Sequence, residues 1–376
     1  MHINFLNIPT ITEDTNFWMV RAKRGFFFEE FVNQGFIAIG WNSITRSMLG
    51  TSLSKERTNA LKESIKDDYG ENRPGTSLNK CIHFCHHMKN GDIVVIVDNG
   101  RIAFAYVGDY YEDNSPQFTV AFEKEIHRQI EDARPSRDVF SCPYIKRRHI
   151  QVIKVLGEND TISPYLQNAI ARNWHSLSDL NEYAEIVLSG CFDSYIYNDK
   201  LTLAFRVKQD DDINTWDLAT FVLFSGKLLS NNHPEQIKVK TTLHSPGDIL
   251  LQVCNTIDWS ATLVVAYLLL FGGKIHDYEL PSLLYLVKKF INREYDKEKK
   301  ELELRKLRAE TELLEEQVIE KRLANNEARR QALLSTVEEC SEFLPMASSN
   351  LKVMPDEQTI IDLTAILDSL QNDDIE

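Results

Sequence analysis

Short apolar segments in the first part of the chain predict a set of β-strands. Their residues alternate or cluster as expected for half-buried and fully buried strands. Asp98-Asn99-Gly100 separates two of them, and an Asn-Gly pair favours a hairpin because both residues adopt positive φ readily. The predicted strands are residues 17–21, 36–41, 92–97, 101–107, 118–122 and 144–156.

Helical periodicity is interleaved with these strands. Segments 25–34, 55–69 and 78–88 repeat apolar residues at helical spacing. Short strands, one hairpin and intervening helices predict an α+β fold whose N-terminal part is a small, partly closed β-barrel. We expect this part to end at 157, because a polar break follows and Ser163-Pro164 is typical of a new helix start.

The rest of the chain divides into three further predicted parts. The second contains helices over 177–189 and 215–229 and a hairpin over 194–208, which together with later strands indicate another α+β domain of unknown role. The third is one long charged helix, and the fourth is an acidic tail with an amphipathic helix. The predicted parts are 1–157, 158–280, 281–336 and 337–376.

The predicted long helix over 281–336 has two interpretations. Its apolar residues follow a seam of about two heptads, fewer than the three to four that define a coiled coil. The alternative is a single solvated helix stabilised by i,i+4 ion pairs. If the seam is used, this helix mediates homo-oligomerisation or binds a partner protein. The seam residues are Leu304, Leu307, Thr311, Leu314 and Val318.

Charge and cysteine usage restrict the function classes. The formal net charge of −14 argues against a surface covered with basic patches for long duplex DNA. The six cysteines include no CxxC pair and the N-terminus has no secretory signal, so we expect a cytoplasmic protein. The apolar run over 261–273 has about 13 residues, whereas a spanning helix needs roughly 20. It is therefore predicted to be a core helix, with no membrane partner.

Catalytic and metal signatures are weak. There is no GxSxG, Walker or HExxH motif. Asp210-Asp211-Asp212 is interpreted as a solvated turn, and Glu235 to Lys238 lacks the preceding carboxylate of a restriction-type nuclease. One helix carries two cysteines and two histidines, but its Cys and His pairs lie about 200° apart and cannot converge on one ion. Those residues are Cys81, His83, Cys85 and His87. We expect no metal and no cofactor.

Several motifs over residues 15–156 carry a resemblance to a known family. They are FWMVRA, FIAIGW, MKNGDIVVI, IAFAYVGDYY and YIKRRHIQVIKVL. The segment resembles the PUA-like and EVE-type domains of restriction and phage-defence proteins. The resemblance implies a pocket for a flipped or modified base or a related planar ligand, held by aromatic stacking and edge hydrogen bonds.

The resemblance also implies residue roles. Trp18 and Trp41 would form walls, and Asp109 would accept a hydrogen bond from an exocyclic amine. Tyr106, Tyr110 and Tyr111 would close the rim. Arg21 would belong to the ligand site and would meet flanking phosphates, and further phosphate contacts would come from Lys146, Arg147 and Arg148. Plain core packing remains an alternative for the aromatic residues.

These observations favour a binding protein over an enzyme. We expect a nucleic-acid or nucleotide-binding sensor or specificity protein, with bacterial restriction or antiviral defence as the setting that the resemblance implies. Two alternatives stay open. One is a nuclease or nucleotide hydrolase with its site within 160–290, and the other is a purely structural oligomer.

Overall fold

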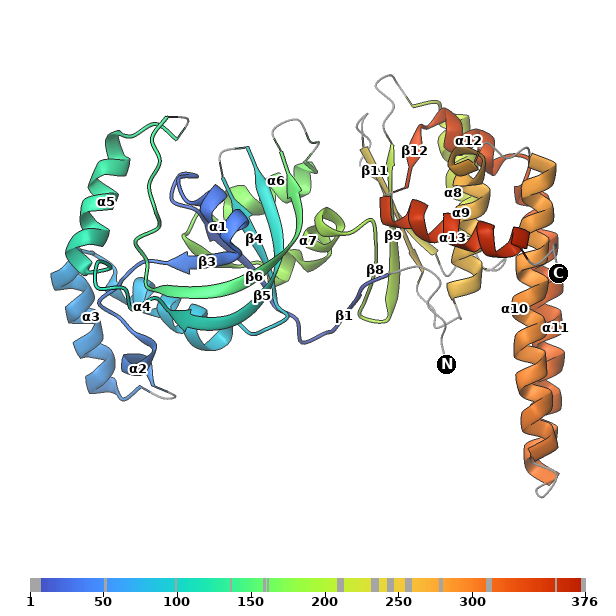
Figure 1. Cartoon of the computed structure of the whole chain (residues 1–376), viewed down its shortest axis with the longest axis horizontal. Coiled ribbons are helices and arrows are strands. Elements are labelled where there is room, and N and C mark those ends of the chain that lie inside the picture. Colours follow the sequence, from blue (N-terminus) through green and yellow to red (C-terminus); the bar gives the residue numbers. More distant parts are fainter. Residues whose placement is uncertain are drawn as a thin grey trace. The chain divides into compact units, whose positions relative to one another are not determined.

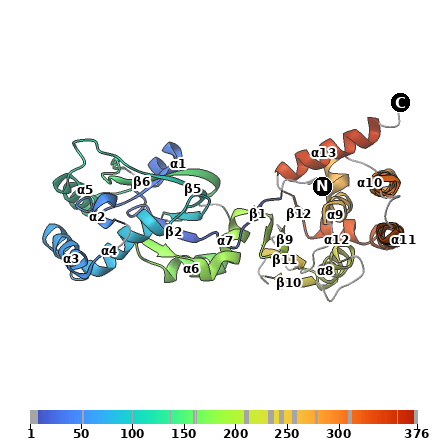
Figure 2. The same ribbon diagram turned by 90° about the horizontal axis from the view of Figure 1, so that it is seen from below.

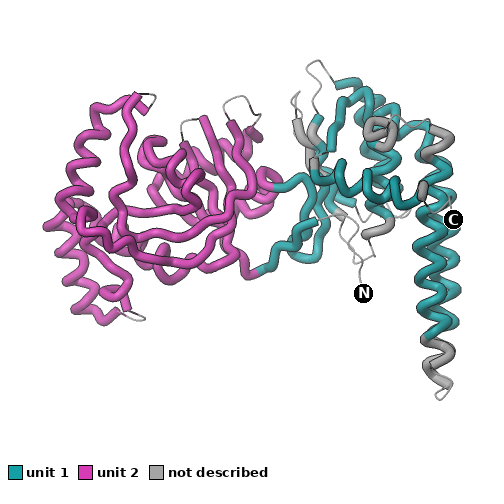
Figure 3. The backbone as a smooth tube through the Cα atoms, viewed as in Figure 1, with its two compact units in different colours: residues 1–13, 192–376 teal, residues 14–191 magenta. Residues whose placement is uncertain are grey.

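The computed structural model divides the chain into two compact units, which are coloured separately in Figure 3. Unit 2 comprises residues 14–191, and unit 1 comprises residues 1–13 and 192–376. Unit 2 is thus inserted into the sequence of unit 1. The structure describes residues 8–50, 53–98, 100–135, 137–157, 160, 162–207, 213–230, 237–241, 247–253, 259–276, 280–308, 313–355 and 357–372.

Unit 2 is built around a six-stranded mixed sheet that curls into a half-barrel (Figure 1). The strand order is β3-β6-β5-β4-β2-β7, with β2 and β4 parallel and the other pairs antiparallel. The fold of unit 2 is therefore α+β, as predicted. Its strands are β2 (Phe17–Arg21), β3 (Phe36–Ile39), β4 (Ile93–Val97), β5 (Ile102–Glu112), β6 (Lys146–Leu156) and β7 (Leu177–Asp179).

Helices cover both faces of this sheet. One face packs with α1, α3 and α4 in a core that includes Val20 and Val94, whereas Phe104 on the other face lies against Leu166 of α6 and Gly190 of α7. The covering elements are α1 (Phe28–Gln34), α2 (Arg46–Leu49), α3 (Lys55–Tyr69), α4 (Pro74–Ile82), a π-helical turn (His83–His87), α5 (Val120–Asp132), α6 (Pro164–Arg172), a 3-10 turn (Asn181–Tyr183) and α7 (Ala184–Cys191).

Two predicted elements of unit 2 are wrong. The segment 118–122 is the start of α5 and not a strand, because the Thr119 side chain accepts a hydrogen bond from the Phe122 backbone N–H and caps the helix. The segment 177–189 was predicted as one helix, but its first residues form β7, which pairs with β2 at the edge of the sheet. Backbone pairing with β2 therefore overrides the local helical pattern.

Unit 1 contains a second mixed sheet, of order β1-β8-β9-β11-β10, with β12 also paired to β9. β1 runs parallel to β8, and the predicted hairpin over 194–208 is confirmed by the antiparallel pair β8–β9. The strands are β1 (Thr10–Ile11), β8 (Ser194–Tyr197), β9 (Lys200–Val207), β10 (Ile237–Thr241), β11 (Gly247–Val253) and β12 (Val353–Met354). The helices are α8 (Thr215–Leu229), α9 (Trp259–His276), α10 (Leu280–Arg308), α11 (Leu313–Cys340), α12 (Leu344–Asn350) and α13 (Glu357–Asn372).

Helix α9 forms the centre of unit 1. Residues 263–271 are all buried in one core with the apolar face of β9 and with parts of α8, α10, α11, α12 and α13. The prediction that this apolar run is a core helix is confirmed. None of the helices that the structure describes combines the length and apolarity needed to cross a membrane.

The predicted single helix over 281–336 is wrong. The chain instead forms α10 and α11, which run side by side (Figures 1 and 2). Ion pairs join Lys288 to Glu338 at 2.7 Å and Arg330 to Asp296 at 4.0 Å, so the two helices are antiparallel. Leu304 of the predicted seam is 55% exposed, and the side chains of the other seam residues lie outside the described part.

The unit boundaries also differ from the predicted ones. Unit 2 extends beyond 157 to Cys191, because β7, α6 and α7 complete its sheet and cover one face. Beyond Cys191 the chain does not divide into the separate parts that were predicted, which were 158–280, 281–336 and 337–376. Their helices share one core, since side chains from α9, α10, α11 and α13 pack together.

Candidate nucleotide-binding pocket

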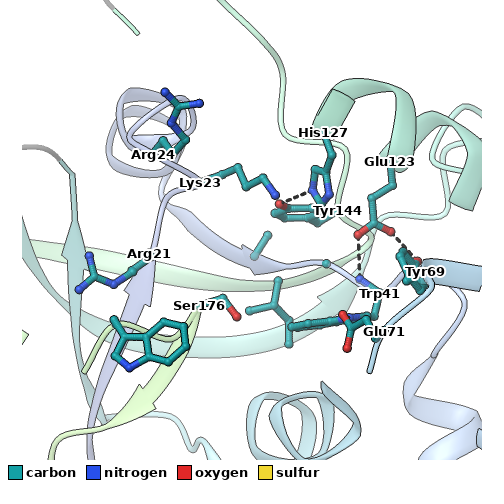
Figure 4. Close-up of a pocket in the computed structure, with 14 residues that line it drawn as sticks. Arg21, Lys23, Arg24, Trp41, Tyr69, Glu71, Glu123, His127, Tyr144 and Ser176 are labelled. Atoms are coloured by element: carbon teal, nitrogen blue, oxygen red, sulfur yellow. Dashed lines mark hydrogen bonds between the residues drawn. The ribbon is translucent and has the colours of Figure 1, made fainter. Parts of the chain in front are cut away.

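Unit 2 contains a pocket with a cavity volume of about 400 Å³, shown in Figure 4. It lies where the turn after β2 and the end of β3 meet α5 and the segment before β7. A pocket of this size is within the range of small-molecule sites. Its lining residues are Arg21, Lys23, Arg24, Ala38, Ile39, Gly40, Trp41, Tyr69, Glu71, Glu123, His127, Tyr144, Trp174 and Ser176.

Trp41 is a half-buried aromatic wall that is held from several sides. Its backbone N–H donates to Glu123 Oε1 at 2.8 Å, and its indole Nε1 donates to Glu71 Oε1 at 2.6 Å. The Lys146 ammonium donates to its carbonyl at 2.6 Å, and the Lys80 ammonium lies 5.3 Å from the ring centroid. These contacts fix the left-handed backbone of Trp41, with φ of +64°, and preorganise the ring.

Glu123 organises the end of the pocket near Trp41. Its carboxylate is buried and also accepts hydrogen bonds from the Asn42 backbone N–H at 2.9 Å and the Tyr69 hydroxyl at 2.7 Å. Burial and the neighbouring carboxylate raise the pKa of Tyr69, so this phenol stays protonated and donates. Gly40 leaves the necessary space, since a Cβ there would lie 2.5 Å from Glu123 Oε1.

A neutral histidine–tyrosine pair forms another part of the lining. His127 Nε2 and the Tyr144 hydroxyl are 2.8 Å apart. Burial and, to a smaller extent, the charge of the Lys23 ammonium together lower the pKa of His127 to about 4. Burial also raises the pKa of Tyr144. Both side chains are therefore uncharged near neutral pH and add polar contacts without adding charge.

Cations from β2 and the following turn supply positive charge. Arg21 Nη2 donates to the Ile170 carbonyl at 2.8 Å, which fixes the guanidinium beside α6. Arg24 Nη1 donates to the Ile130 carbonyl at 3.1 Å, at the C-terminal end of α5 where a cation is favourable. Lys23 extends toward the Tyr144–His127 pair (Figure 4).

Trp174 is a second indole of the lining, and its side chain reaches solvent. It is 70% exposed, in contrast to the half-buried Trp41. It lies between α6 and β7, and its ring centroid is 4.3 Å from that of His175. An exposed indole at a pocket is well placed for contact with a ligand, because it remains half free of protein packing.

Among the residues predicted from the sequence, Trp41 and Arg21 line the pocket. The others predicted to bind ligand are not among its described lining residues: Trp18, Tyr106, Asp109, Tyr110 and Tyr111. Trp18 is only 4% exposed, and its Nε1 donates to Asp92 Oδ2 at 2.8 Å. The indole of Trp18 is thus part of the core that joins β2 to β4.

The predicted rim residues on β5 make contacts of their own. Tyr110 donates its hydroxyl to Glu112 Oε1 at 2.7 Å, and the Tyr111 ring stacks on His149 with centroids 4.4 Å apart. Asp109 accepts a hydrogen bond from the Asn90 amide. Tyr106 is half-buried. The structure therefore does not bring these side chains together with Trp41.

The predicted phosphate contacts Lys146, Arg147 and Arg148 are buried in β6. The Lys146 ammonium donates to two carbonyls, including that of Ile44 at 2.9 Å. Arg147 pairs with Asp113 at 3.1 Å. Arg148 donates to three carbonyls, those of Phe84, Gly108 and Met88. The donors of these cations face acceptors of the protein itself. The three side chains therefore stabilise the fold and are not directed toward a site where a phosphate could bind.

Most of the pocket was not found from the sequence. Lys23 and Arg24 directly follow the quoted FWMVRA segment. Their closeness in sequence to Arg21 was therefore a signal that could have identified them. Glu123 and His127 are four residues apart on one face of α5, a signal hidden by the mistaken strand. Trp174 and Ser176 lie beyond the expected domain end. Tyr69 and Glu71 lie in segments that carry no pattern pointing to a ligand, and Tyr144 begins the quoted YIKRRHIQVIKVL motif, in which only the basic residues were assigned a role.

The other chemical candidates are placed as follows. Cys81 and Cys85 are buried, and the rings of His83 and His87 lie 4.8 Å apart. Within the described residues, no three His, Cys, Asp or Glu side chains are arranged to hold a metal ion. The triplet 210–212 and Glu235 lie outside the described residues, so the structure does not test their predicted roles.

Comparison with known proteins adds a partial match. A family model described as a domain of unknown function (DUF8426) matches residues 19–121. This stretch runs from β2 into the start of α5, so it includes Arg21, Lys23 and Trp41 but ends before Glu123 and Trp174. No curated protein matches the chain, and no solved structure matches it.

Proposed function

We propose that unit 2 binds a planar heterocyclic base, as a nucleotide or as part of a nucleic acid, in the pocket beside Trp41. The observation that carries this proposal is the fixed indole at the wall of a cavity of about 400 Å³. A preorganised aromatic surface loses little conformational entropy when a ligand stacks on it. Base–aromatic stacking contributes about 1–3 kcal/mol per base.

The polar groups of the pocket support a base over a purely apolar ligand. Neutral His127 and Tyr144 can form hydrogen bonds with a base edge, and Glu71 is half-exposed beside the Trp41 indole. The combination of an aromatic wall and a few placed polar groups is typical of sites that read the edge of a base outside its stack.

The curled sheet of unit 2 is compatible with the PUA-like or EVE-type barrel that the sequence resembles. On that resemblance we propose a sensor or specificity role, with a modified base as one ligand and defence against foreign nucleic acid as the setting. In this proposal unit 1 transmits binding to a partner protein or to a second copy of the chain.

The test is a pair of tryptophan variants with a matched control. Trp174→Ala removes a pocket indole that is 70% exposed, and Trp216→Ala removes an indole of α8 in unit 1 that is 68% exposed. Both substitutions should leave the fold intact because each side chain is largely exposed to solvent. Binding of deoxynucleoside monophosphates and a short single-stranded DNA is measured by calorimetry, including probes that contain 5-methylcytosine.

We expect Trp174→Ala to weaken binding by about five-fold or more, as one stacking contact implies, and Trp216→Ala to leave affinity unchanged. Trp41→Ala should weaken binding about 5- to 150-fold. The proposal is refuted if none of the probes binds, or if the two exposed-tryptophan variants have equal affinities.

A further inference from the structure

The turn after β2 has an unusual backbone that places a lysine at the pocket. Lys23, Arg24 and Gly25 have φ of +47°, +58° and +87°, so three consecutive residues are left-handed. L-residues adopt this region with strain, which persists only where surrounding contacts hold it. Arg24 is held by α5, and a Cβ on Gly25 would lie 1.7 Å from Asp98 Oδ1. The turn is therefore fixed by its contacts with α5 and with Asp98.

Three polar groups of the pocket have no hydrogen-bond partner within the described part of the chain. Two of them, Arg21 Nε and Ser176 Oγ, are buried atoms that no described residue contacts with a hydrogen bond. The Lys23 ammonium makes no hydrogen bond or ion pair with any residue that the structure describes, and its burial lowers its pKa. Buried donors are normally paired, so a cluster of unpaired ones indicates a ligand.

Arg21 and Ser176 are neighbours, because the Arg21 backbone N–H donates to the Ser176 carbonyl at 3.0 Å. Both lie at one end of the pocket, and Glu123 lies at the other end (Figure 4). Lys23 extends between them toward Tyr144. The unpaired groups thus all belong to the lining of the same cavity.

The carboxylates of the pocket have hydrogen-bond donors of their own, although the charge of Glu123 also attracts the Lys23 ammonium. Glu123 is occupied by the three hydrogen bonds from Trp41, Asn42 and Tyr69. Glu71 accepts from the Trp41 indole and from the Ser77 hydroxyl. The free capacity of the site is therefore mainly cationic and donor-rich, which suits an anion with several acceptor oxygens.

We propose that the ligand carries a phosphate, and that Lys23, Arg21 and Ser176 supply the donors of its subsite within the pocket. This inference rests on the proposed base-binding function, since it places the phosphate beside a base that stacks on Trp41. A phosphate offers more acceptor oxygens than a carboxylate and matches three donors, two from the end of β2 and its turn and one from the segment before β7. The phosphate belongs either to a free nucleotide or to a strand.

Four probes separate these possibilities: thymidine, thymidine 5′-monophosphate, a thymidine tetramer without terminal phosphates, and ribose 5-phosphate. They are titrated by calorimetry into the full chain and into Lys23→Met. Lys89→Met is the matched control, because it removes an exposed lysine of unit 2 outside the described pocket lining and changes net charge equally.

We expect the full chain to bind the monophosphate or the tetramer at least about ten-fold more tightly than thymidine. Lys23→Met should remove most of that preference, and Lys89→Met should retain it. Preference for the monophosphate assigns the phosphate to a free nucleotide, and preference for the tetramer assigns it to a strand. Both results support the subsite.

Equal affinity for thymidine and both phosphorylated probes would overturn the subsite while leaving base binding intact. Equal losses in Lys23→Met and Lys89→Met would overturn it as well. If ribose 5-phosphate binds as tightly as the monophosphate and Lys23→Met alone weakens it, the subsite stands and the proposed base binding fails. The two proposals therefore fail separately.

Discussion

Replacement of Glu123 by Gln tests whether this carboxylate holds Trp41 in place. The carboxylate is 1% exposed and accepts the backbone N–H groups of Trp41 and Asn42 and the hydroxyl of Tyr69. A Gln amide has one oxygen and one NH₂ group. Its NH₂ group would therefore face one of the donors that the carboxylate accepts, and neither donor would have an acceptor there. A lost charge-assisted hydrogen bond costs about 1.5–3 kcal/mol, and an unpaired buried donor costs about 1–3 kcal/mol.

We therefore expect Glu123→Gln to lower the free energy of unfolding by about 3 kcal/mol. Urea unfolding measures the total change, and hydrogen exchange of the Trp41 and Asn42 amides reports the local one. Glu125→Gln is the control, because Glu125 lies on the same helix, pairs with Arg128 at the surface and should change stability by less than about 0.5 kcal/mol. Equal unfolding midpoints and equal protection of both amides in the two variants would refute the reasoning.

Two further predictions follow from the same unit. Because burial lowers the pKa of His127 to about 4 from its ordinary value of 6.5, the unfolded chain binds more protons between these values and stability rises with pH across that window. His127→Gln should reduce this slope in unfolding measurements, and an unaltered slope would contradict the buried neutral ring. Gly25→Ala should destabilise the protein more than Gly70→Ala, because both glycines have positive φ but only Gly25 has Asp98 in the space of a Cβ. Equal unfolding free energies of the two variants would show that Asp98 moves aside without cost.

Local sequence patterns predicted the strands of unit 2 better than its helix ends. Alternation and an Asn-Gly turn identified β4 and β5, because both signals depend on residues close in sequence. The strand predicted over 118–122 failed because its aromatic residues outweighed the capping hydroxyl of Thr119. The missed β7 forms only through pairing with β2, which no short window contains.

The candidate site shows the same division. Trp41 was identified because it ends a strand beside glycine, but Trp18 on a similar strand has its indole turned to Asp92 by the parallel pairing of β2 with β4. The basic run 146–148 was predicted to contact phosphates. In the structure β6 lies between β3 and β5, and backbone carbonyls accept the hydrogen bonds that its basic side chains donate. Charge along a sequence does not reveal which acceptors the fold supplies. Trp174 entered the pocket through tertiary structure alone.

The pairing of β1 with β8 has a consequence for synthesis. Thr10 lies opposite Ile196 in that parallel pair, although the whole of unit 2 separates them in the chain. Domains generally fold as they emerge from the ribosome. The pocket of unit 2 can therefore form first, whereas β1 has no strand to pair with until β8 has been translated. A truncated chain that begins at residue 14 would keep the pocket of unit 2 but would lack β1, the edge strand of the sheet in unit 1.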